Sequence, residues 1–493
     1  MASAIEGLEP AGLWEYFAAI SAIPRCSKHE AEAGRYVFGA AKKLGLEVFR
    51  DSKGNVIVRK KARPGRTNAP PVALQSHLDM VCEKNNNTAH DFSRDPIVLK
   101  RQRDFLTADG TTLGADNGIG VATALAIMED TAINHGPLEF VFTVDEETGL
   151  TGAANLRSDA LKSRMLINLD TEDEGVLYVG CAGGRDSTGT LHVAFEPLPA
   201  KPAKHELYVL RVSGLRGGHS GINIHTGRGN AIKLLSRAVA ELSCCGARGA
   251  RLCSLSGGNK RNAIPREAEA IIAVPAAAAE AAVEKTAELD RLYKSEYAAA
   301  DSGVSITITA FKGKKARLPA RVMKKVCEAR LVNLLNALPH GVIAMSQDIP
   351  GLVETSTNCA RVTTKKNTVV IETSQRSSVE SRKAEIVQAV KACFALAGAK
   401  VAHGDGYPGW KPDLQSPILK IAKETYRRLF GKEADVKAVH AGLECGIIGE
   451  KFPGMDMLSL GPTLEMVHSP EERVHIGSVK KYWDYLLAIL ESV

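Results

Sequence analysis

The sequence lacks an uninterrupted apolar run long enough to cross a bilayer, which takes about 18 residues. Its most apolar low-complexity stretch, AIIAVPAAAAEAAV at 270–283, is broken by Pro275 and Glu280. The N-terminal segment MASAIEGLEP has an acid and a proline where a secretory signal needs a basic start and an apolar core. We therefore expect no transmembrane helix, no membrane partner and, by default, a cytoplasmic location.

Aromatic residues and excess charge of one sign are also scarce. Aromatics make up 5% of the 493 residues, the net charge is only +7, and the chain has no dense block of Lys and Arg. This composition argues against a nucleic-acid partner. The glycine-rich LGADNGIGVAT departs from GxGxxG at Thr123 and is not followed by GKS or GKT, so nucleotide binding is disfavoured as well.

Paired cysteine motifs are missing. The ten cysteines form no CxxC and no zinc-finger spacing. We expect them to be reduced, mostly buried thiols of an intracellular protein. A thiolate metal site is therefore not expected.

The pattern of apolar and polar residues divides the chain into two kinds of region. Up to about residue 203, and again from 400, apolar strand-like segments such as PVALQSHLDM and PLEFVFTVDEE alternate with helix-like segments such as DNGIGVATALAIMED. This alternation predicts an α/β fold whose sheet is covered on both faces. A Pro- and Lys-rich connection, AFEPLPAKPAKHE, precedes a region with other strands and helices. We therefore expect a catalytic domain of 1–203 and 400–493, interrupted by an inserted α/β domain of 204–399.

Histidines and acids gather where the apolar strands end. His77 and Asp79 lie two apart at the end of one strand, so they can converge on one point. The carboxyl ends of strands in an open α/β sheet form the edge where ligands bind. The other candidates at such positions are Asp116 in LGADNG, Glu146 and Glu147 in FTVDEETG, Asp170 in INLD, and His468 in MVHSPEE.

Each of these residues alone has an ordinary structural interpretation. Asp116 could cap the helix that follows it, His468 could be a core histidine, and His77 with Asp79 could be a buried structural pair. Two histidines with three or four carboxylates from separate strand ends instead suit a two-metal site with nitrogen and oxygen ligands. Zn²⁺ or a similar divalent ion prefers such ligands.

At this point the sequence resembles a known family, the M20 (clan MH) metallopeptidases, and within it most closely the aminoacyl-histidine dipeptidases. The resemblance covers essentially the whole chain. It is carried, in order, by SHLDMV, GADNGIG, DEETGLTGA, NLD, GGHSGINI, HAGLECG and GPTLEMVHSPEE. The fold that it implies is a mixed-sheet zinc-peptidase catalytic domain with an inserted α/β lid and dimerisation domain.

The resemblance also implies roles for the strand-end residues. His77 and Asp170 would hold one zinc ion, Glu147 and His468 the other, and Asp116 would bridge both. Asp79 would orient His77, and Glu146 would be the general base. A cis peptide bond is expected after Asp116. The implied cofactors are two divalent ions, with Zn²⁺ as the expected metal and Co²⁺ or Mn²⁺ as substitutes.

The inserted region and the HAGLECG motif contribute further candidates by the same resemblance. His219, in RGGHSGINIHTGRGN, would donate to the carbonyl oxygen in the transition state. Asn262 and Arg376 are candidates for the carboxylate of the substrate, and Glu444 for its amine. In related enzymes the lid histidine can come from the partner subunit, so a homodimer is expected.

The expected activity is hydrolysis of small peptides, preferentially Xaa-His dipeptides such as β-alanyl-histidine (carnosine). One alternative is another M20 amidohydrolase activity, either that of a broad dipeptidase acting on substrates such as Cys-Gly or that of an N-acyl amino-acid deacylase. A non-catalytic metal- or peptide-binding protein is the alternative from another class. The intact Glu146 argues against this last alternative.

Overall fold

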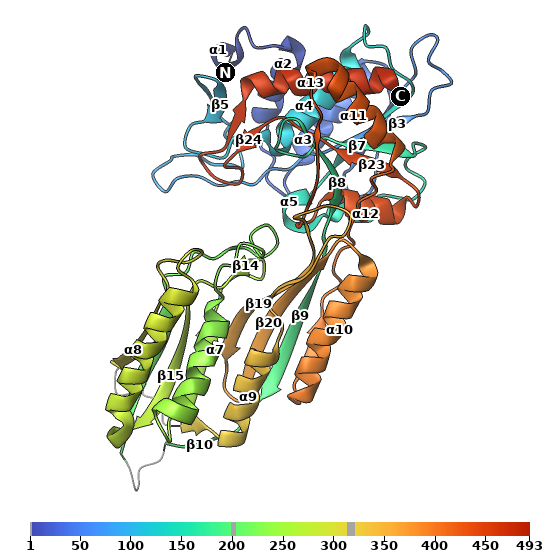
Figure 1. Ribbon diagram of the computed structural model, residues 1–493. Coiled ribbons are helices and arrows are strands. Elements are labelled where there is room, and N and C mark those ends of the chain that lie inside the picture. Colours follow the sequence, from blue (N-terminus) through green and yellow to red (C-terminus); the bar gives the residue numbers. More distant parts are fainter. Residues whose placement is uncertain (1, 199–203, 313–320) are drawn as a thin grey trace. The chain divides into compact units, whose positions relative to one another are not determined.

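The computed structural model describes residues 2–198, 204–312 and 321–493 (Figure 1). The chain divides into two compact units. Unit 1 comprises Met1–Cys181, Trp410–Ala438 and Leu443–Val493, and unit 2 comprises Ala182–Gly409 and Val439–Gly442. Part of the connection expected from the sequence, residues 199–203, lies outside the described residues.

The described part of unit 1 is built on an eight-stranded mixed sheet with the order β1-β2-β6-β3-β7-β23-β8-β22. In chain order these strands are β1 (Glu47–Arg50), β2 (Val56–Lys60), β3 (Val72–His77), β6 (Leu138–Thr143), β7 (Met165–Asn168), β8 (Val176–Cys181), β22 (Asp435–Val439) and β23 (Asp456–Ser459). Its centre is parallel: β3 runs parallel to β6 and β7, with His77 opposite Thr143 and Gln75 opposite Asn168. The carboxyl ends of these three strands therefore meet at one edge of the sheet.

Helices pack around this sheet because their apolar faces must be buried. Helix α4 is buried along almost its whole length, and it packs against both α2 and β3. Trp14 and Phe17 of α2, together with Phe140 and Phe142 of β6, are fully buried in the core. The helices of unit 1 are α1 (Ala2–Ile5), α2 (Ala11–Ser21), α3 (Ala31–Lys43), α4 (Ala115–Glu129), α5 (Glu146–Gly149), α6 (Thr151–Asn155), α11 (Pro417–Phe430), α12 (Glu444–Lys451) and α13 (Ile476–Ser492).

A small second sheet in unit 1 fixes a late loop of the chain. It has the order β24-β25-β5-β4, formed by β4 (Leu99–Gln102), β5 (Phe105–Ala108), β24 (Leu464–Glu465) and β25 (Arg473–His475). Strands β24 and β25 are antiparallel neighbours, so they hold both ends of the loop at 466–472. His468 lies in this loop, with a positive φ of 63°.

Unit 2 contains a nine-stranded antiparallel sheet whose described strands follow the order β16-β11-β15-β13-β19-β20-β9-β21, with β18 also paired to β19. These strands are β9 (Gly183–His192), β11 (His205–Ser213), β13 (Arg251–Gly257), β15 (Ala268–Pro275), β16 (Ser305–Ala310), β18 (Gly341–Met345), β19 (Val353–Thr364), β20 (Thr368–Ser377) and β21 (Lys400–His403). Four helices lie side by side along the sheet in Figure 1 and share one apolar core with it: α7 (Ala231–Glu241), α8 (Ala279–Glu296), α9 (Lys325–Ala337) and α10 (Glu380–Leu396).

This sheet consists of two halves with the same βαββαβ connectivity. The first half is β11-α7-β13-β15-α8-β16, and the second is β9-α9-β19-β20-α10-β21. The first half is inserted between β9 and α9 of the second. The halves join where β13 pairs antiparallel with β19, at Ser256–Thr363 and Gly257–Val362. Unit 2 begins earlier than the expected residue 204 because β9 pairs along its full length with β20.

The expectation that all cysteines are reduced is wrong for one pair. Cys26 and Cys82 form a disulfide, with their Cα atoms 5.7 Å apart. The two segments meet because Cys26 and Met80 form a parallel bridge beyond the end of β3. Cys253, Cys359 and Cys445 fit the expectation, as buried cysteines outside this disulfide.

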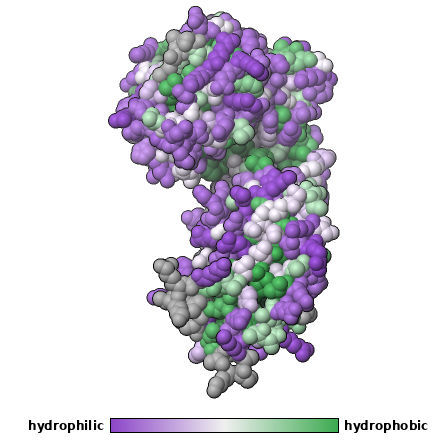
Figure 2. Space-filling view, turned by 90° about the vertical axis from the view of Figure 1, so that its left-hand side faces the viewer, coloured by the Kyte–Doolittle hydropathy of each residue, from purple (hydrophilic) through white to green (hydrophobic). Residues whose placement is uncertain are grey.

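No described helix has the length and apolarity that a bilayer-crossing span requires. The face of unit 1 drawn in Figure 2 is predominantly hydrophilic, as the charged fraction of 24% leads one to expect.

Candidate metal centre

The first part of the site is built where β3 ends. His77 is buried, with 1% of its surface exposed. Its Nδ1 lies 3.1 Å from the backbone oxygen of Asp79 and 3.4 Å from Asp79 Oδ1, which leaves Nε2 to face the site. The carboxylate of Asp79 also accepts hydrogen bonds from the backbone N–H groups of Glu146 and Glu147, at 3.0 and 3.1 Å. Asp79 therefore links the end of β3 to the start of α5.

Asp116 lies at a kink near the start of α4, where it and Asn117 have non-helical φ and ψ. The peptide bond between these two residues is cis, which confirms the expectation from the sequence. The Asn117 side chain donates to the backbone oxygen of Leu169 at 2.6 Å and accepts the backbone N–H of His77 at 3.3 Å. It thus ties the start of α4 to the ends of β3 and β7.

The carboxylate of Asp116 lies between two imidazoles. Its Oδ1 is 3.1 Å from His77 Nε2, and its Oδ2 is 3.1 Å from His468 Nε2. Asp170 Oδ1 lies 3.2 Å from His77 Nε2 on one side, and Glu147 Oε2 lies 3.0 Å from His468 Nε2 on the other.

Two groups of potential ligands result, and they share Asp116. One is His77, Asp116 and Asp170, and the other is Asp116, Glu147 and His468; the donor atoms within each lie within 4.8 Å of one another. Glu146 stands beside them, in a third such group with His77 and Glu147. The structure thus brings together the strand-end residues that the sequence singled out.

The electrostatics of this cluster favour a cation. Burial raises the pKa of Asp170 to about 7 and raises the pKa of Glu146 well above its usual range. Hydrogen bonds to Asp116 and Glu147 raise the pKa of His468 to about 11. Burial alone would raise the pKa of Asp116, but hydrogen bonds with His468 and His77 outweigh it and lower that pKa. Carboxylates crowded away from water need positive charge nearby, and the cluster holds only two imidazoles.

The donor set fits divalent metal ions. Imidazole nitrogens and carboxylate oxygens are the ligands that Zn²⁺ accepts when no thiolates are present. In addition, the buried Asp170 Oδ1 has no donor of its own, because its nearest nitrogen, His77 Nε2 at 3.2 Å, also faces Asp116 Oδ1 at 3.1 Å. A buried carboxylate oxygen without a donor costs free energy that a bound cation would remove.

Three candidates from the inserted region lie in unit 2. His219 is in β12 (Gly218–His219), which pairs with β14 (Ala263–Ile264) directly after Asn262. Its Nδ1 accepts backbone N–H groups from Gly221 and Ile222, at 3.3 and 3.1 Å. In the neutral imidazole the proton is therefore on Nε2. Burial and the charge of Arg376 lower the pKa of His219 to about 4, which favours this neutral form.

The other two candidates in unit 2 differ in exposure. The Asn262 side chain is exposed, and its backbone oxygen accepts the N–H of Ser220 at 2.8 Å. Arg376, on β20, is only 7% exposed and donates to the hydroxyl of Tyr407 at 2.8 Å. Its Nε is buried without an acceptor in the described structure.

Glu444 begins α12 in unit 1 and is fully buried. Its Oε2 accepts hydrogen bonds from Gln75 and Thr143, both at 2.6 Å, and burial raises its pKa to about 7. Gln75 in turn accepts a hydrogen bond from Asn168 at 2.6 Å. Gln75 and Asn168 stand two residues before His77 and Asp170, and sequence reasoning did not single them out. A signal for them was present in the sequence: each is a polar residue in a buried strand, two positions before a proposed ligand and therefore on the same side of the strand.

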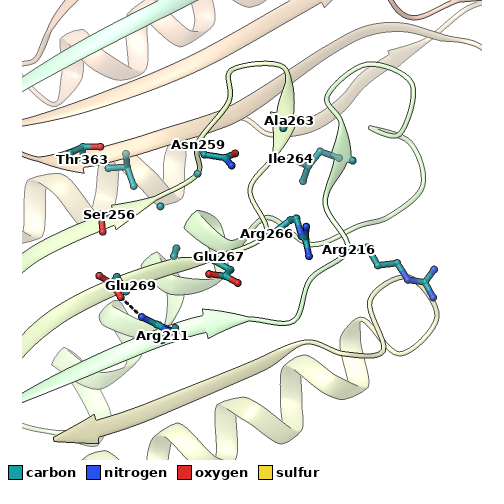
Figure 3. A pocket seen from close by; sticks show the side chains of 15 residues that line it. Arg211, Arg216, Ser256, Asn259, Ala263, Ile264, Arg266, Glu267, Glu269 and Thr363 are labelled. Atoms are coloured by element: carbon teal, nitrogen blue, oxygen red, sulfur yellow. Dashed lines mark hydrogen bonds and ion pairs between the residues drawn. The ribbon is translucent and has the colours of Figure 1, made fainter. Parts of the chain in front are cut away.

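A separate cavity of about 700 Å³ opens on unit 2 (Figure 3). Arg211, Arg216 and Arg266 line it together with Glu267 and Glu269, and Arg211 forms an ion pair with Glu269 at 2.8 Å. The cavity is therefore of mixed charge. None of the site residues singled out from the sequence lines it.

The strand ends of the mixed sheet thus gather imidazoles and carboxylates around one shared aspartate, a donor set of the kind that metal-dependent hydrolases use. The family model for peptidase family M20/M25/M40 matches residues 73–492, and the chain belongs to that family. It is therefore a hydrolase that acts on peptide bonds.

Two relatives are similar over nearly the full length. The chain is 44% identical over 495 residues to the cytosol non-specific dipeptidase of Escherichia coli (strain K12), covering 100% of this chain and 99% of that one. The crystal structure of the aminoacylhistidine dipeptidase from Vibrio alginolyticus matches with 41% identity and a TM-score of 0.89, over 99% of this chain and 98% of that one. The aminopeptidase PepT from Bacillus cereus, at 17% identity and a TM-score of 0.56 over 98% and 99% of the two chains, shares the fold.

Proposed function

We propose that this protein is a two-metal dipeptidase that hydrolyses small dipeptides, with Xaa-His dipeptides such as β-alanyl-histidine as preferred substrates. One observation carries the proposal: the carboxylate of Asp116 has one oxygen 3.1 Å from His77 and the other 3.1 Å from His468. A carboxylate with both oxygens facing ligand groups suits two ions held side by side. The names of the two full-length relatives support the choice of dipeptides.

In this proposal the five ligand residues divide into two sets. His77 and Asp170 would hold one ion, Glu147 and His468 the other, and Asp116 both. Zn²⁺ suits this donor set, with Co²⁺ or Mn²⁺ as substitutes. Bound ions of this kind would lower the pKa of a water molecule and polarise the carbonyl of the scissile bond.

The protein's own residues would do the remaining work. Glu146 would accept the proton of the attacking water at its carboxylate and deliver it to the leaving amine, the usual task of a general base that turns into an acid. Its backbone N–H is held by Asp79, as is that of the adjacent Glu147. Asp79 would therefore keep the base and one ligand in a fixed relation while it orients His77.

Substrate recognition would fall to residues of unit 2. The Nε2 proton of His219 would be donated to the carbonyl oxygen as negative charge develops there. Arg376, whose planar guanidinium suits a carboxylate, and the exposed Asn262 would bind the carboxylate of the dipeptide. For Glu444, complete burial favours a supporting role beneath the ligand residues over the contact with the substrate amine expected from the sequence.

Unit 2 would act as a lid and carry the contact of a homodimer, and the enzyme would work in the cytoplasm. Light scattering coupled to size-exclusion chromatography tests the dimer, and fractionation of the producing cells tests the location.

The decisive experiment is a substrate panel. Metal-free protein reconstituted with Zn²⁺ is assayed on β-Ala-His, on Cys-Gly and on an N-acetyl amino acid, with and without a chelator. The proposal expects chelator-sensitive hydrolysis that is fastest for β-Ala-His. Comparable rates on Cys-Gly would indicate a broad dipeptidase, and hydrolysis of the N-acetyl amino acid alone would indicate a deacylase. Absence of turnover by protein with both ions bound would contradict the proposal.

A further inference from the structure

A buried glutamate holds the backbone directly in front of Asp116. The carboxylate of Glu472 accepts hydrogen bonds from four consecutive backbone N–H groups: those of Leu113 and Gly114 at 2.8 and 2.9 Å through Oε2, and those of Ala115 and Asp116 at 2.8 and 3.2 Å through Oε1. Only 2% of the glutamate is exposed. The N–H groups at the start of a helix have no partner within the helix, so this carboxylate supplies one from a distant part of the chain.

A buried arginine holds the same segment from its other side. Arg25 is 1% exposed, and its guanidinium donates to the backbone oxygens of Leu78 and Asp79, both at 3.1 Å, and to that of Gly114. The peptide groups at Gly114 are therefore bound on both sides, with its N–H on Glu472 and its carbonyl on Arg25. Gly114 has a φ of 70°, and a Cβ there would lie 2.6 Å from the Arg25 guanidinium.

The position of Glu472 in the chain connects the segment before Asp116 to the loop that carries His468. Glu472 lies four residues after His468, in the same loop between β24 and β25. Asp116 and His468, whose side chains meet at 3.1 Å, are therefore also connected through the backbone. The connection runs from His468 along the loop to Glu472 and across its hydrogen bonds to the N–H of Asp116.

We propose that Glu472 and Arg25 are positioning residues for the metal centre: together they fix the backbone at 113–116 so that the Asp116 carboxylate stays between His77 and His468. This inference rests on the proposed two-metal function. Neither residue is assigned a contact with the substrate or with an ion. Because Glu472 belongs to the loop of His468, its loss should weaken the set of Asp116, Glu147 and His468 more than the set of His77, Asp116 and Asp170.

The test compares two isosteric substitutions in unit 1. Glu472→Gln keeps the size of the side chain but replaces one carboxylate oxygen by an amide N–H₂ group. The two backbone N–H groups that this oxygen accepted then lose their acceptor. Glu139→Gln is the matched control, because Glu139 is likewise buried and accepts the backbone N–H groups of Lys162 and Ser163, at 2.9 and 2.8 Å, but lies on β6 four residues before its end. Circular dichroism and thermal unfolding of both metal-free variants establish that they fold.

Zn²⁺ binding is the main readout. Metal-free protein is titrated with Zn²⁺ against a chromophoric chelator. We expect wild type to bind two equivalents of Zn²⁺, and Glu139→Gln to bind each of them as tightly as wild type does. Glu472→Gln should bind the weaker of the two equivalents about 10–100-fold less tightly than wild type, the range typical when a hydrogen-bond partner of a metal ligand is lost. Hydrogen exchange of the amides at 113–116 should be faster in Glu472→Gln alone. With metal in excess, kcat should fall while KM stays unchanged, because no substrate contact is lost.

The outcomes separate this inference from the proposed function. If wild type binds fewer than two equivalents, the two-metal function fails. If wild type binds two and Glu472→Gln binds them equally well, the positioning role is refuted. Arg25→Lys, which keeps the charge but cannot reach three carbonyls, is the second variant and should change Zn²⁺ binding in the same direction. If both variants fail to fold while Glu139→Gln folds, their role is general to the fold and the inference is overturned.

Discussion

The carboxylate of Asp79 accepts the backbone N–H of Glu146 at 3.0 Å. Asp79, which contacts the proposed metal ligand His77, therefore also fixes the backbone of the proposed general base Glu146. Asp79→Asn would place an amide where N–H donors point. We expect kcat to fall about 10–100-fold, as is typical when the partner of a metal ligand is lost. Steady-state kinetics and metal analysis measure the effect. Ser27→Ala removes only the hydroxyl that donates to Asp79 at 2.7 Å and serves as the control, with a smaller loss expected.

The role of Glu146 can be separated from that of a ligand. Glu146→Gln should retain both metal ions and lose about 10²–10⁴-fold in kcat, which is the usual contribution of general acid–base catalysis. His468→Ala should instead lose or weaken one metal equivalent. Metal content by elemental analysis and turnover on β-Ala-His are measured for both variants. Near wild-type kcat in Glu146→Gln, or an unchanged metal content in His468→Ala, would contradict these assignments.

His219 is expected to matter for turnover and not for metal binding. Removal of one oxyanion donor typically costs about 10²–10³-fold in kcat, so His219→Ala should show a loss of that size with both ions bound. His225→Ala, in the same glycine-rich loop, is the matched control and should stay near wild type. The readouts are kcat and metal content.

Mixed subunits show which chain His219 serves. A His219→Ala protein is unfolded and refolded together with a Glu146→Ala protein, and heterodimers are isolated by different affinity tags. If the lid histidine serves the partner's metal site, each heterodimer contains one working site and activity returns. Inactive heterodimers would mean that His219 acts within its own chain or not at all.

The protonation of His219 gives a prediction on pH. Its pKa of about 4 lies below the value of about 6.5 in an unfolded chain. The neutral form is therefore favoured by folding, and the resulting stability is present above pH 6.5 and is lost as the pH falls toward 4. Arg376→Met should raise the pKa of His219 but leave it below 6.5, because burial is the larger cause. NMR titration of the metal-free protein measures it, and Arg211→Met, which replaces an exposed arginine of β11, is the control.

The disulfide between Cys26 and Cys82 is open to direct chemical test. Denatured protein purified without reductant should gain two titratable thiols after reduction. The oxidised form should resist urea better, by about 2–4 kcal/mol in the free energy of unfolding, because the bond restricts the unfolded chain. In a reducing compartment the pair would be open, so both forms need to be assayed. An equal thiol count before and after reduction would rule out the bond.

The centre of unit 1 could be predicted from the sequence because its signals are local. Strands β3 and β6 begin with apolar residues and are buried on both faces, and the residues after them were readable as strand ends. The role of Glu472 could not be predicted, although this residue ends the motif HSPEE that contains the proposed ligand His468. Its hydrogen bonds reach residues more than 350 positions away in the chain, and no spacing rule connects them.

Unit 2 was harder to predict because one of its central strands does not look like a strand. Strand β19, VETSTNCARVTT, is mostly polar, yet seven of its first eight residues are buried. It lies in the middle of the sheet, where hydrogen bonds to neighbouring strands and side chains compensate its polar groups. The shared connectivity of the two halves was hidden for a related reason: one half is inserted into the other, so the halves do not follow each other as a repeat.

The join between β13 and β19 also limits how copies of this chain can associate. Each βαββαβ half, taken alone, would expose one long edge strand with unpaired N–H and C=O groups, and such an edge readily pairs with another chain. Here the two edges pair with each other within one chain at Ser256–Thr363 and Gly257–Val362, and β18 pairs with β19 between Val353 and Thr357. Among the described strands of this sheet, β16 and β21 end the strand order, and β18 is a third edge because it pairs with β19 alone. A homodimer that continued the sheet from one copy to the next would do so at β16, at β21 or at the outer edge of β18.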